Sequence, residues 1–284
     1  MGIRPKTLLL AFTPITLGTV LALPLVQQVN WLTFFSALMT AFSVQAGANL
    51  VNDALDFKKG ADTAARAGPK RVTPLGIYSP KEVLRAGLAA FLLAFGCGIP
   101  LIAIGGWPAA CFIGIAVLSG YAYTGGPRPL AYRGGSEFFI LAFFGIGAVN
   151  AAYFFQVGHF ALEPLIAGIQ LGFLAIVPLA INNLRDIKED KKADKKTLAV
   201  RFGKTFALWE TGCCLLAPFF IGIYWLLNGK ILSFWLPLMG APLSCLILIS
   251  LFYVLSDQDY NQFIFLSILL QFFFAFLIAL SVFL

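Results

Sequence analysis

The chain has 284 residues, of which 60% are hydrophobic and only 12% are charged, and its mean hydropathy is +0.87. These values exclude a soluble globular domain, because too few polar side chains remain to cover a surface that faces water. The formal net charge of +7 is explained below by membrane topology, so we expect no nucleic-acid partner.

Apolar runs of about 20 residues recur along the whole chain, and this is the length that crosses a bilayer as an α-helix. The sequence therefore predicts an all-α membrane protein, with residues 1–284 forming a single domain. The nine predicted spans lie at about 7–26, 31–51, 83–104, 107–124, 137–156, 162–182, 205–227, 233–255 and 262–283.

The basic residues predict the orientation, because Lys and Arg collect in cytoplasmic loops. With a cytoplasmic N-terminus, 19 of the 20 Lys and Arg residues lie on the inner side and only Lys230 lies outside. Nine spans then place the C-terminus outside. We expect a multi-pass protein of the cell membrane, inner or plasma, with its long polar loops in the cytoplasm.

The end of the second predicted span carries a first polar motif, Asn52-Asp53-Ala54-Leu55-Asp56, and Asp62 follows it. Residues three or four positions apart share one face of a helix. The face that carries this motif is therefore a polar stripe. Its members are Gln45, Asn49, Asn52 and Asp56.

The sixth predicted span ends in a second motif, in which Asn182, Asp186 and Asp190 share one helix face. Two such faces that meet in a bundle repel each other unless cations neutralise them. Ligands that offer only oxygen suit Mg²⁺, which binds carboxylates together with substrate phosphates. We therefore expect Mg²⁺ to bridge the two motifs to a phosphate. Asp194 lies within a run of lysines and is expected to be solvated.

Other metal or nucleophile chemistry has little support in the sequence. The single histidine, His159, lies in a short outer loop, and the five cysteines fall within predicted spans without metal-ligand spacing.

Four stretches together resemble the UbiA superfamily of intramembrane prenyltransferases, and within it the 1,4-dihydroxy-2-naphthoate polyprenyltransferases of menaquinone and phylloquinone synthesis. These stretches are residues 52–63 (NDALDFKKGADT), 68–71 (GPKR), 123–130 (YTGGPRPL) and 182–203 (NNLRDIKEDKKADKKTLAVRFG). The sequence departs from the superfamily motifs at two positions. Gly60 stands where a further Asp is frequent, and Pro127 replaces the Lys of a Tyr-x-x-x-Lys motif.

The resemblance implies nine helices around a central cavity, where Mg²⁺ binds the diphosphate of an isoprenoid donor. The prenyl group then passes to 1,4-dihydroxy-2-naphthoate with loss of CO₂, which gives a demethylmenaquinone-type product. The metal ligands that it implies are Asn52, Asp56, Asp186 and Asp190. The catalytic residues that it implies are Asp53, Arg71 and Tyr123. The residues expected to bind substrate are Lys58, Arg66, Lys70, Arg71, Tyr123, Arg128, Arg133, Asn183, Arg185 and Lys188.

Several alternatives stay open at this point. The acceptor could be another aromatic compound, such as 4-hydroxybenzoate, homogentisate or a different dihydroxynaphthoate. A different class, the cation-coupled transporter, also places carboxylates in a membrane, although its sites usually lie near the bilayer midplane. Beyond the donor, the aromatic acid and the lipid bilayer, no obligate protein partner is evident. Donor chain length and oligomeric state are open.

Overall fold

The structure is a computed structural model that describes residues 2, 4–60, 71–254 and 256–284. Within this part of the chain every regular element is helical, which confirms the predicted all-α class. Eight segments in it are long and apolar enough to cross a membrane. The chain is therefore a multi-pass membrane protein.

The helices follow one another with short connections. Those of the first half are α1 (Pro5–Ala22), α2 (Trp31–Lys58), α3 (Pro80–Ala122), α4 (Ser136–Ile140) and α5 (Ala148–Val157). Those of the second half are α6 (Leu162–Arg185), α7 (Ile187–Lys192), α8 (Leu198–Ile221), α9 (Ile223–Leu227), α10 (Ile231–Trp235), α11 (Ala241–Leu251) and α12 (Asp257–Leu280). A π-helix (Leu141–Gly147) joins α4 to α5, and 3-10 turns occupy Leu23–Leu25, Leu130–Tyr132 and Pro237–Gly240.

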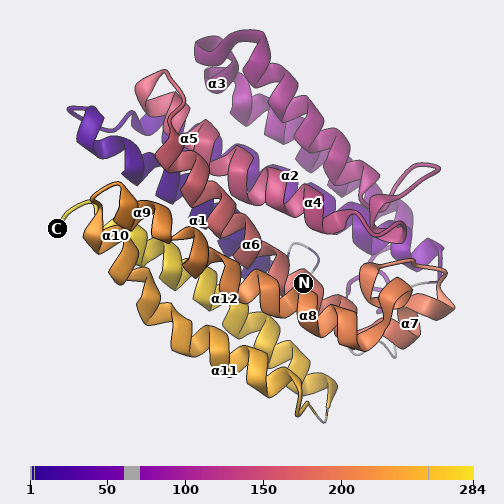
Figure 1. The fold of residues 1–284 in the computed structure, drawn as a ribbon. Helices are drawn as coiled ribbons and strands as arrows, with labels where there is room; N and C mark the ends of the chain where they lie inside the picture. The colour runs from indigo at the N-terminus through magenta and orange to yellow at the C-terminus, as the bar shows by residue number, and fades with distance from the viewer. Residues whose placement is uncertain (1, 3, 61–70, 255) are drawn as a thin grey trace.

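The longest helix, α3, consists of two limbs. Its 43 residues exceed what a single crossing needs, because about 20 residues span the hydrocarbon core. Gly106 interrupts the helix with a φ of 63° and a ψ of −152°, a conformation that essentially only glycine adopts. The two limbs double back and lie side by side (Figure 1), so the chain reverses its direction at Gly106.

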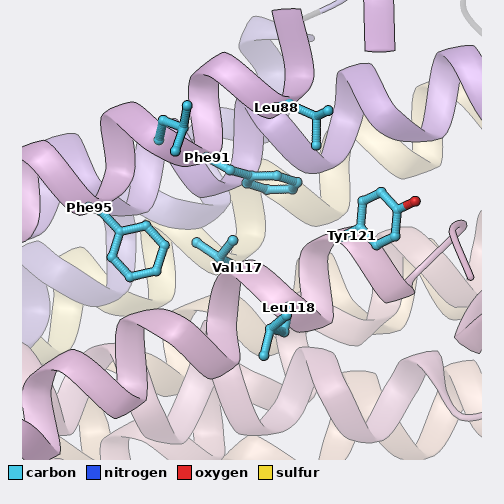
Figure 2. A pocket seen from close by; sticks show the side chains of 7 residues that line it. Leu88, Phe91, Phe95, Val117, Leu118 and Tyr121 are labelled. Atoms are coloured by element: carbon cyan, nitrogen blue, oxygen red, sulfur yellow. The ribbon is translucent and has the colours of Figure 1, made fainter. Parts of the chain in front are cut away.

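An apolar groove of about 320 Å³ lies between the two limbs of α3. Figure 2 shows the aromatic and aliphatic side chains that line it. These are Leu88, Phe91, Leu92, Phe95, Val117, Leu118 and Tyr121.

Helix α6 lies in the middle of the bundle (Figure 1) and packs against α8, α12 and the π-helix. Small residues allow the closest of these contacts. A Cβ atom added at Gly145 would lie 2.4 Å from both the carbonyl oxygen of Gly168 and the Cα of Gly172. The π-helix and α6 therefore meet backbone to backbone, as is common where membrane helices carry small residues.

The connections between helices gather at two opposite ends of the bundle. At one end the ammonium of Lys59 donates to the carbonyl oxygen of Thr124 over 2.6 Å, which joins the end of α2 to the end of α3. At the other end Asn30 donates its backbone N–H to the side-chain oxygen of Gln156 over 2.8 Å. Helix α7 marks the first end in Figure 1, and the C-terminus lies at the second. Both polar motifs belong to the first end.

Candidate active site

The first motif is helical, because α2 continues beyond its apolar part to Lys58. Asp53 and Asp56 are each only 1% exposed, and burial of a carboxylate is costly unless it is paired. One oxygen of Asp53, Oδ2, accepts the backbone N–H of Val72 over 3.1 Å, which ties the segment after residue 70 to α2. The other oxygen, Oδ1, is buried without a hydrogen-bond partner among the described residues.

Asp56 is the centre of the polar site. Its Oδ2 lies 3.3 Å from Nη1 of Arg71 and 3.2 Å from Nζ of Lys195, and its Oδ1 accepts the hydroxyl of Tyr132 over 3.0 Å. Arg71 also donates from Nη1 to Oδ1 of Asn52 over 2.9 Å. Four segments of the chain therefore meet at this one carboxylate.

The second motif spans a break in the helix. The sequence predicts one continuous helix face here, but α6 ends at Arg185 and α7 begins at Ile187. The helical hydrogen bonds continue across the break, because Asp186 donates its N–H to the carbonyl of Asn182 over 3.0 Å and Asp190 donates to that of Asp186 over 2.8 Å. Backbone spacing within the motif is therefore kept.

Arg185 neutralises the second motif from within. Its guanidinium donates to both carboxylate oxygens of Asp186, over 2.6 and 2.8 Å, and to Oδ1 of Asn182 over 2.6 Å. A further bond from Nη1 reaches Asn261 at the start of α12. A bidentate pair of this kind is strong and directional. Arg185, expected to bind substrate, thus has carboxylate and amide partners in the protein.

Lys195 connects the two motifs. Its Nζ lies 3.2 Å from Asp56 Oδ2 and 3.8 Å from Asp190 Oδ1. The predicted meeting of the two acidic faces is therefore confirmed for these two carboxylates. The expectation that they lack local cations is wrong, because Arg71, Arg185 and Lys195 each pair with a motif carboxylate.

Tyr132 lies between two ammonium groups. Nζ of Lys59 is 4.5 Å from the centre of its ring and Nζ of Lys195 is 5.2 Å from it. Such cation–π contacts are attractive. Burial lowers the pKa of Lys59, and the charge of Lys195 adds to this effect while the carboxylate of Asp56 opposes it.

Tyr123 and Asn183 lie near this cluster but have other partners. The carbonyl of Tyr123 accepts the N–H of Ala131 over 2.9 Å, which folds the intervening loop back. The side-chain amide of Asn183 donates to Oε1 of Glu137 on α4 over 3.3 Å.

The remaining predicted residues are not gathered into the site. The structure leaves four basic side chains at the surface. These are Lys58, Arg128, Arg133 and Lys188. Arg66 and Lys70, together with Asp62, lie outside the described residues. Asp194 is exposed, as expected, with 88% of its side chain accessible.

Sequence reasoning missed four residues that the structure places at the site, namely Lys59, Tyr132, Lys195 and Asn261. Lys195 is one of four lysines between residues 191 and 196, and no local pattern separates it from the others. Tyr132 follows a glycine- and proline-rich turn that predicts a loop and no contact. The capping box of α12, formed by Ser256 and Asp259, predicts where this helix begins but not that Asn261 meets Arg185.

The donor set at this site fits Mg²⁺. Oxygen atoms of Asn52, Asp56 and Asp190 converge on positively charged groups, and Asp53 keeps one buried oxygen free of hydrogen bonds among the described residues. Within the same part of the chain no three His, Cys, Asp or Glu side chains form a complete metal cage. This also suits Mg²⁺, which usually binds one or two carboxylates together with water and substrate phosphates.

An apolar helical bundle that carries carboxylates, amides and basic side chains at one end defines a membrane protein that handles an anionic group there. The chain belongs to the UbiA prenyltransferase family, whose pattern matches residues 11–282. This confirms the resemblance found in the motifs.

Two relatives show how far the similarity extends. The chain is 34% identical over 255 residues to the 1,4-dihydroxy-2-naphthoate octaprenyltransferase of Escherichia coli (strain K12), covering 85% of this chain and 80% of the relative. It is 38% identical over 210 residues to the protein of the same name from Haemophilus influenzae, covering 70% and 67%. Among solved structures, a UbiA homologue from Archaeoglobus fulgidus bound to DMAPP and Mg²⁺ shares the fold, with a TM-score of 0.65, 18% identity and coverage of 98% and 97%.

Proposed function

We propose that the protein transfers a polyprenyl group from its diphosphate to 1,4-dihydroxy-2-naphthoate, with Mg²⁺ as cofactor and loss of CO₂. The observation that carries this proposal is the joining of the two acidic motifs at Asp56, Lys195 and Asp190, at one end of an apolar bundle. Such a site suits a charged diphosphate with a long apolar tail. Relatives that carry the name 1,4-dihydroxy-2-naphthoate octaprenyltransferase support the choice of acceptor.

In this proposal Asn52, Asp56, Asp186 and Asp190 hold Mg²⁺, and Asp53 supports them from its buried position on α2. When bound, Mg²⁺ polarises the diphosphate as the allylic C–O bond breaks. This role has a parallel in the A. fulgidus homologue, which binds DMAPP with Mg²⁺.

The basic residues of the site would bind the diphosphate oxygens. Arg71 and Lys195 are already held at Asp56, so their positive charge lies where the leaving group gains negative charge. We propose that Lys58, Arg66, Lys70, Arg185 and Lys188 also contribute to this positive field. Tyr123 and Asn183 border the site, and Arg128 and Arg133 on the adjoining loop would meet the carboxylate of the acceptor.

The acceptor supplies the remaining electrons. Its two hydroxyls enrich the naphthalene ring, and the carbon that bears the carboxylate forms the new C–C bond. Loss of CO₂ then returns the electron pair of the broken C–C bond to the ring and restores aromaticity, so no protein base has to remove a proton from that carbon. The apolar bundle excludes water, which would otherwise capture the prenyl cation.

The topology that goes with this function has nine spans in one domain around a central cavity, because α3 crosses the membrane twice. We propose a cytoplasmic N-terminus, an outer C-terminus and a site that opens to the cytoplasm of a cell with this protein in its inner or plasma membrane. The position of 19 of the 20 basic residues supports this orientation.

The test incubates the purified protein with Mg²⁺, prenyl diphosphates of several lengths and a panel of aromatic acids. We expect the naphthoate to be prenylated and an equal amount of CO₂ to be released, both followed by mass spectrometry. If 4-hydroxybenzoate were prenylated with its carboxylate retained while the naphthoate stayed inert, the acceptor assignment would be wrong although prenyl transfer would stand. If no acceptor were prenylated, the proposed function would be wrong.

A further inference from the structure

Lys195 differs from the lysines around it in burial and in contacts. Only 11% of its side chain is exposed, whereas 61% of the Lys196 side chain is. Its Nζ lies between Asp56 of α2 and Asp190 of α7, at 3.2 and 3.8 Å from their nearest oxygens. It therefore links residues that are 139 and five positions away in the sequence.

The backbone holds Lys195 in this position. Asp194 has a φ of 53°, in the left-handed region, so the chain turns sharply after α7. Lys195 then donates its N–H to the carbonyl of Asp190 over 2.9 Å, and Lys196 donates to the carbonyl of Tyr132 over 3.1 Å. With its ammonium 5.2 Å from the centre of the Tyr132 ring, Lys195 is held by four separate contacts with its surroundings.

The same oxygen atoms are the metal ligands of the proposed function, and this has an electrostatic consequence. A divalent cation and an ammonium that contact one carboxylate oxygen repel each other, strongly so where little water screens them. Asp56 is 1% exposed, so screening is weak. Binding of Mg²⁺ to Asp56 and Asp190 must therefore displace the ammonium of Lys195.

We propose that Lys195 is a tethered counter-ion that joins the two motifs, competes with Mg²⁺ for Asp56 and Asp190, and turns to the diphosphate once Mg²⁺ takes their oxygens. The inference rests on the proposed function in its choice of Mg²⁺ and diphosphate. Its first part concerns this chain's own carboxylates and is measurable without any turnover.

The experiment compares the full-length wild-type protein with Lys195→Met, Lys195→Gln, Lys195→Arg and Lys196→Met in detergent. Calorimetry measures Mg²⁺ affinity without substrate. Thermal unfolding is followed in EDTA and in excess Mg²⁺. We expect Lys195→Met and Lys195→Gln to bind Mg²⁺ about tenfold more tightly, because the competing charge is gone.

The stability measurement separates competition from a merely structural role. Without Mg²⁺ the Met and Gln variants should unfold at a lower temperature, since two buried carboxylates lose a partner. Their rise in melting temperature on adding Mg²⁺ should exceed that of the wild type, because tighter binding stabilises the folded state more. Lys195→Arg, which keeps the charge, and the exposed control Lys196→Met should both behave like the wild type.

An unchanged or weaker Mg²⁺ affinity in both neutral variants would overturn the inference, and so would an arginine variant that matches them. The Gln variant serves if the Met variant does not fold. For the second part, inorganic pyrophosphate is titrated at saturating Mg²⁺, and we expect several-fold weaker binding to the neutral variants; equal binding overturns that part. A wild type that prenylates no acceptor would refute the proposed function but leave these titrations interpretable.

Discussion

Asp56 shows how one buried charge organises several loops. Its carboxylate binds Arg71, Tyr132 and Lys195, which come from three separate segments of the chain. These groups replace the water that the carboxylate loses on burial, and a buried carboxylate without them would be very unfavourable. The same negative charge is needed in the proposed function to hold Mg²⁺.

Replacing a motif carboxylate should therefore abolish turnover. We expect Asp56→Asn and Asp186→Asn to lower the turnover rate by at least about 100-fold at saturating Mg²⁺, because electrostatic stabilisation of the leaving group is lost. Asp194→Asn is the matched control, since this side chain is 88% exposed and Asn tolerates a left-handed φ as well as Asp does. Near-normal steady-state rates in both motif variants would contradict the metal-site assignment.

Tyr132 allows a hydrogen bond and a ring contact to be separated. Tyr132→Phe loses only the hydroxyl bond to Asp56, so we expect a loss of about 1 kcal/mol in unfolding free energy. Tyr132→Leu also removes the ring next to Lys59 and Lys195 and should lose about 1 kcal/mol more. Thermal unfolding in detergent measures both, with the exposed Tyr78→Phe as control. Equal losses for the two Tyr132 variants would show that the ring contributes nothing.

At the scale of the element, α3 depends on a single glycine. Gly106 has a φ of 63° and a ψ of −152°, which L-residues with a side chain essentially do not adopt. A Cβ atom there would lie 3.7 Å from Cδ of Pro108 at its nearest contact, which is ordinary van der Waals distance. The reversal between the two limbs is therefore limited by backbone conformation and not by space.

This predicts opposite effects for two glycines of the same helix. Gly106→Ala should lower the free energy of unfolding by roughly 1–3 kcal/mol through backbone strain. Gly114→Ala, at a helical position where a Cβ meets nothing within 4 Å, should be neutral or stabilising by up to about 1 kcal/mol. Unfolding in mixed detergent measures both. Equal stability of the Gly106 variant and the wild type would mean that the reversal does not require this backbone geometry.

At the scale of the whole molecule, both acidic motifs and most basic residues lie at one end of the bundle, and the pair formed by Lys230 and Glu163 lies at the other. Their side-chain atoms Nζ and Oε1 are 3.3 Å apart. A polar end that carries the site and an almost uncharged opposite end suit an enzyme whose charged substrate arrives from one compartment only.

The orientation can be measured by labelling single cysteines in intact cells. In a background without the five native cysteines, Asn228→Cys should react with a membrane-impermeant maleimide from outside. Lys191→Cys, exposed next to the second motif, should react only after the membrane is permeabilised. The reverse pattern would place the site on the outer side and would contradict the proposed topology.

Much of the fold follows from local properties of the sequence. Apolar runs of bilayer length predict membrane helices because the hydrocarbon core leaves the backbone no other partner for its polar groups. The predicted boundary between the third and fourth spans coincides with the non-helical Gly106. The two acidic motifs also follow from spacing alone, since residues three or four apart share a helix face.

The sequence by itself thus determined the membrane class, the helical segments, the two acidic motifs and the family. Only the tertiary structure decided which basic residues meet those motifs. Lys195 is buried between Asp56 and Asp190 while Lys196 beside it is exposed, and Arg185 is bound by Asp186 and Asn261. The physical reason is that a charge selects its partner through burial and distance across the bundle, and residues 139 positions apart, such as Asp56 and Lys195, share no local pattern that would reveal the contact.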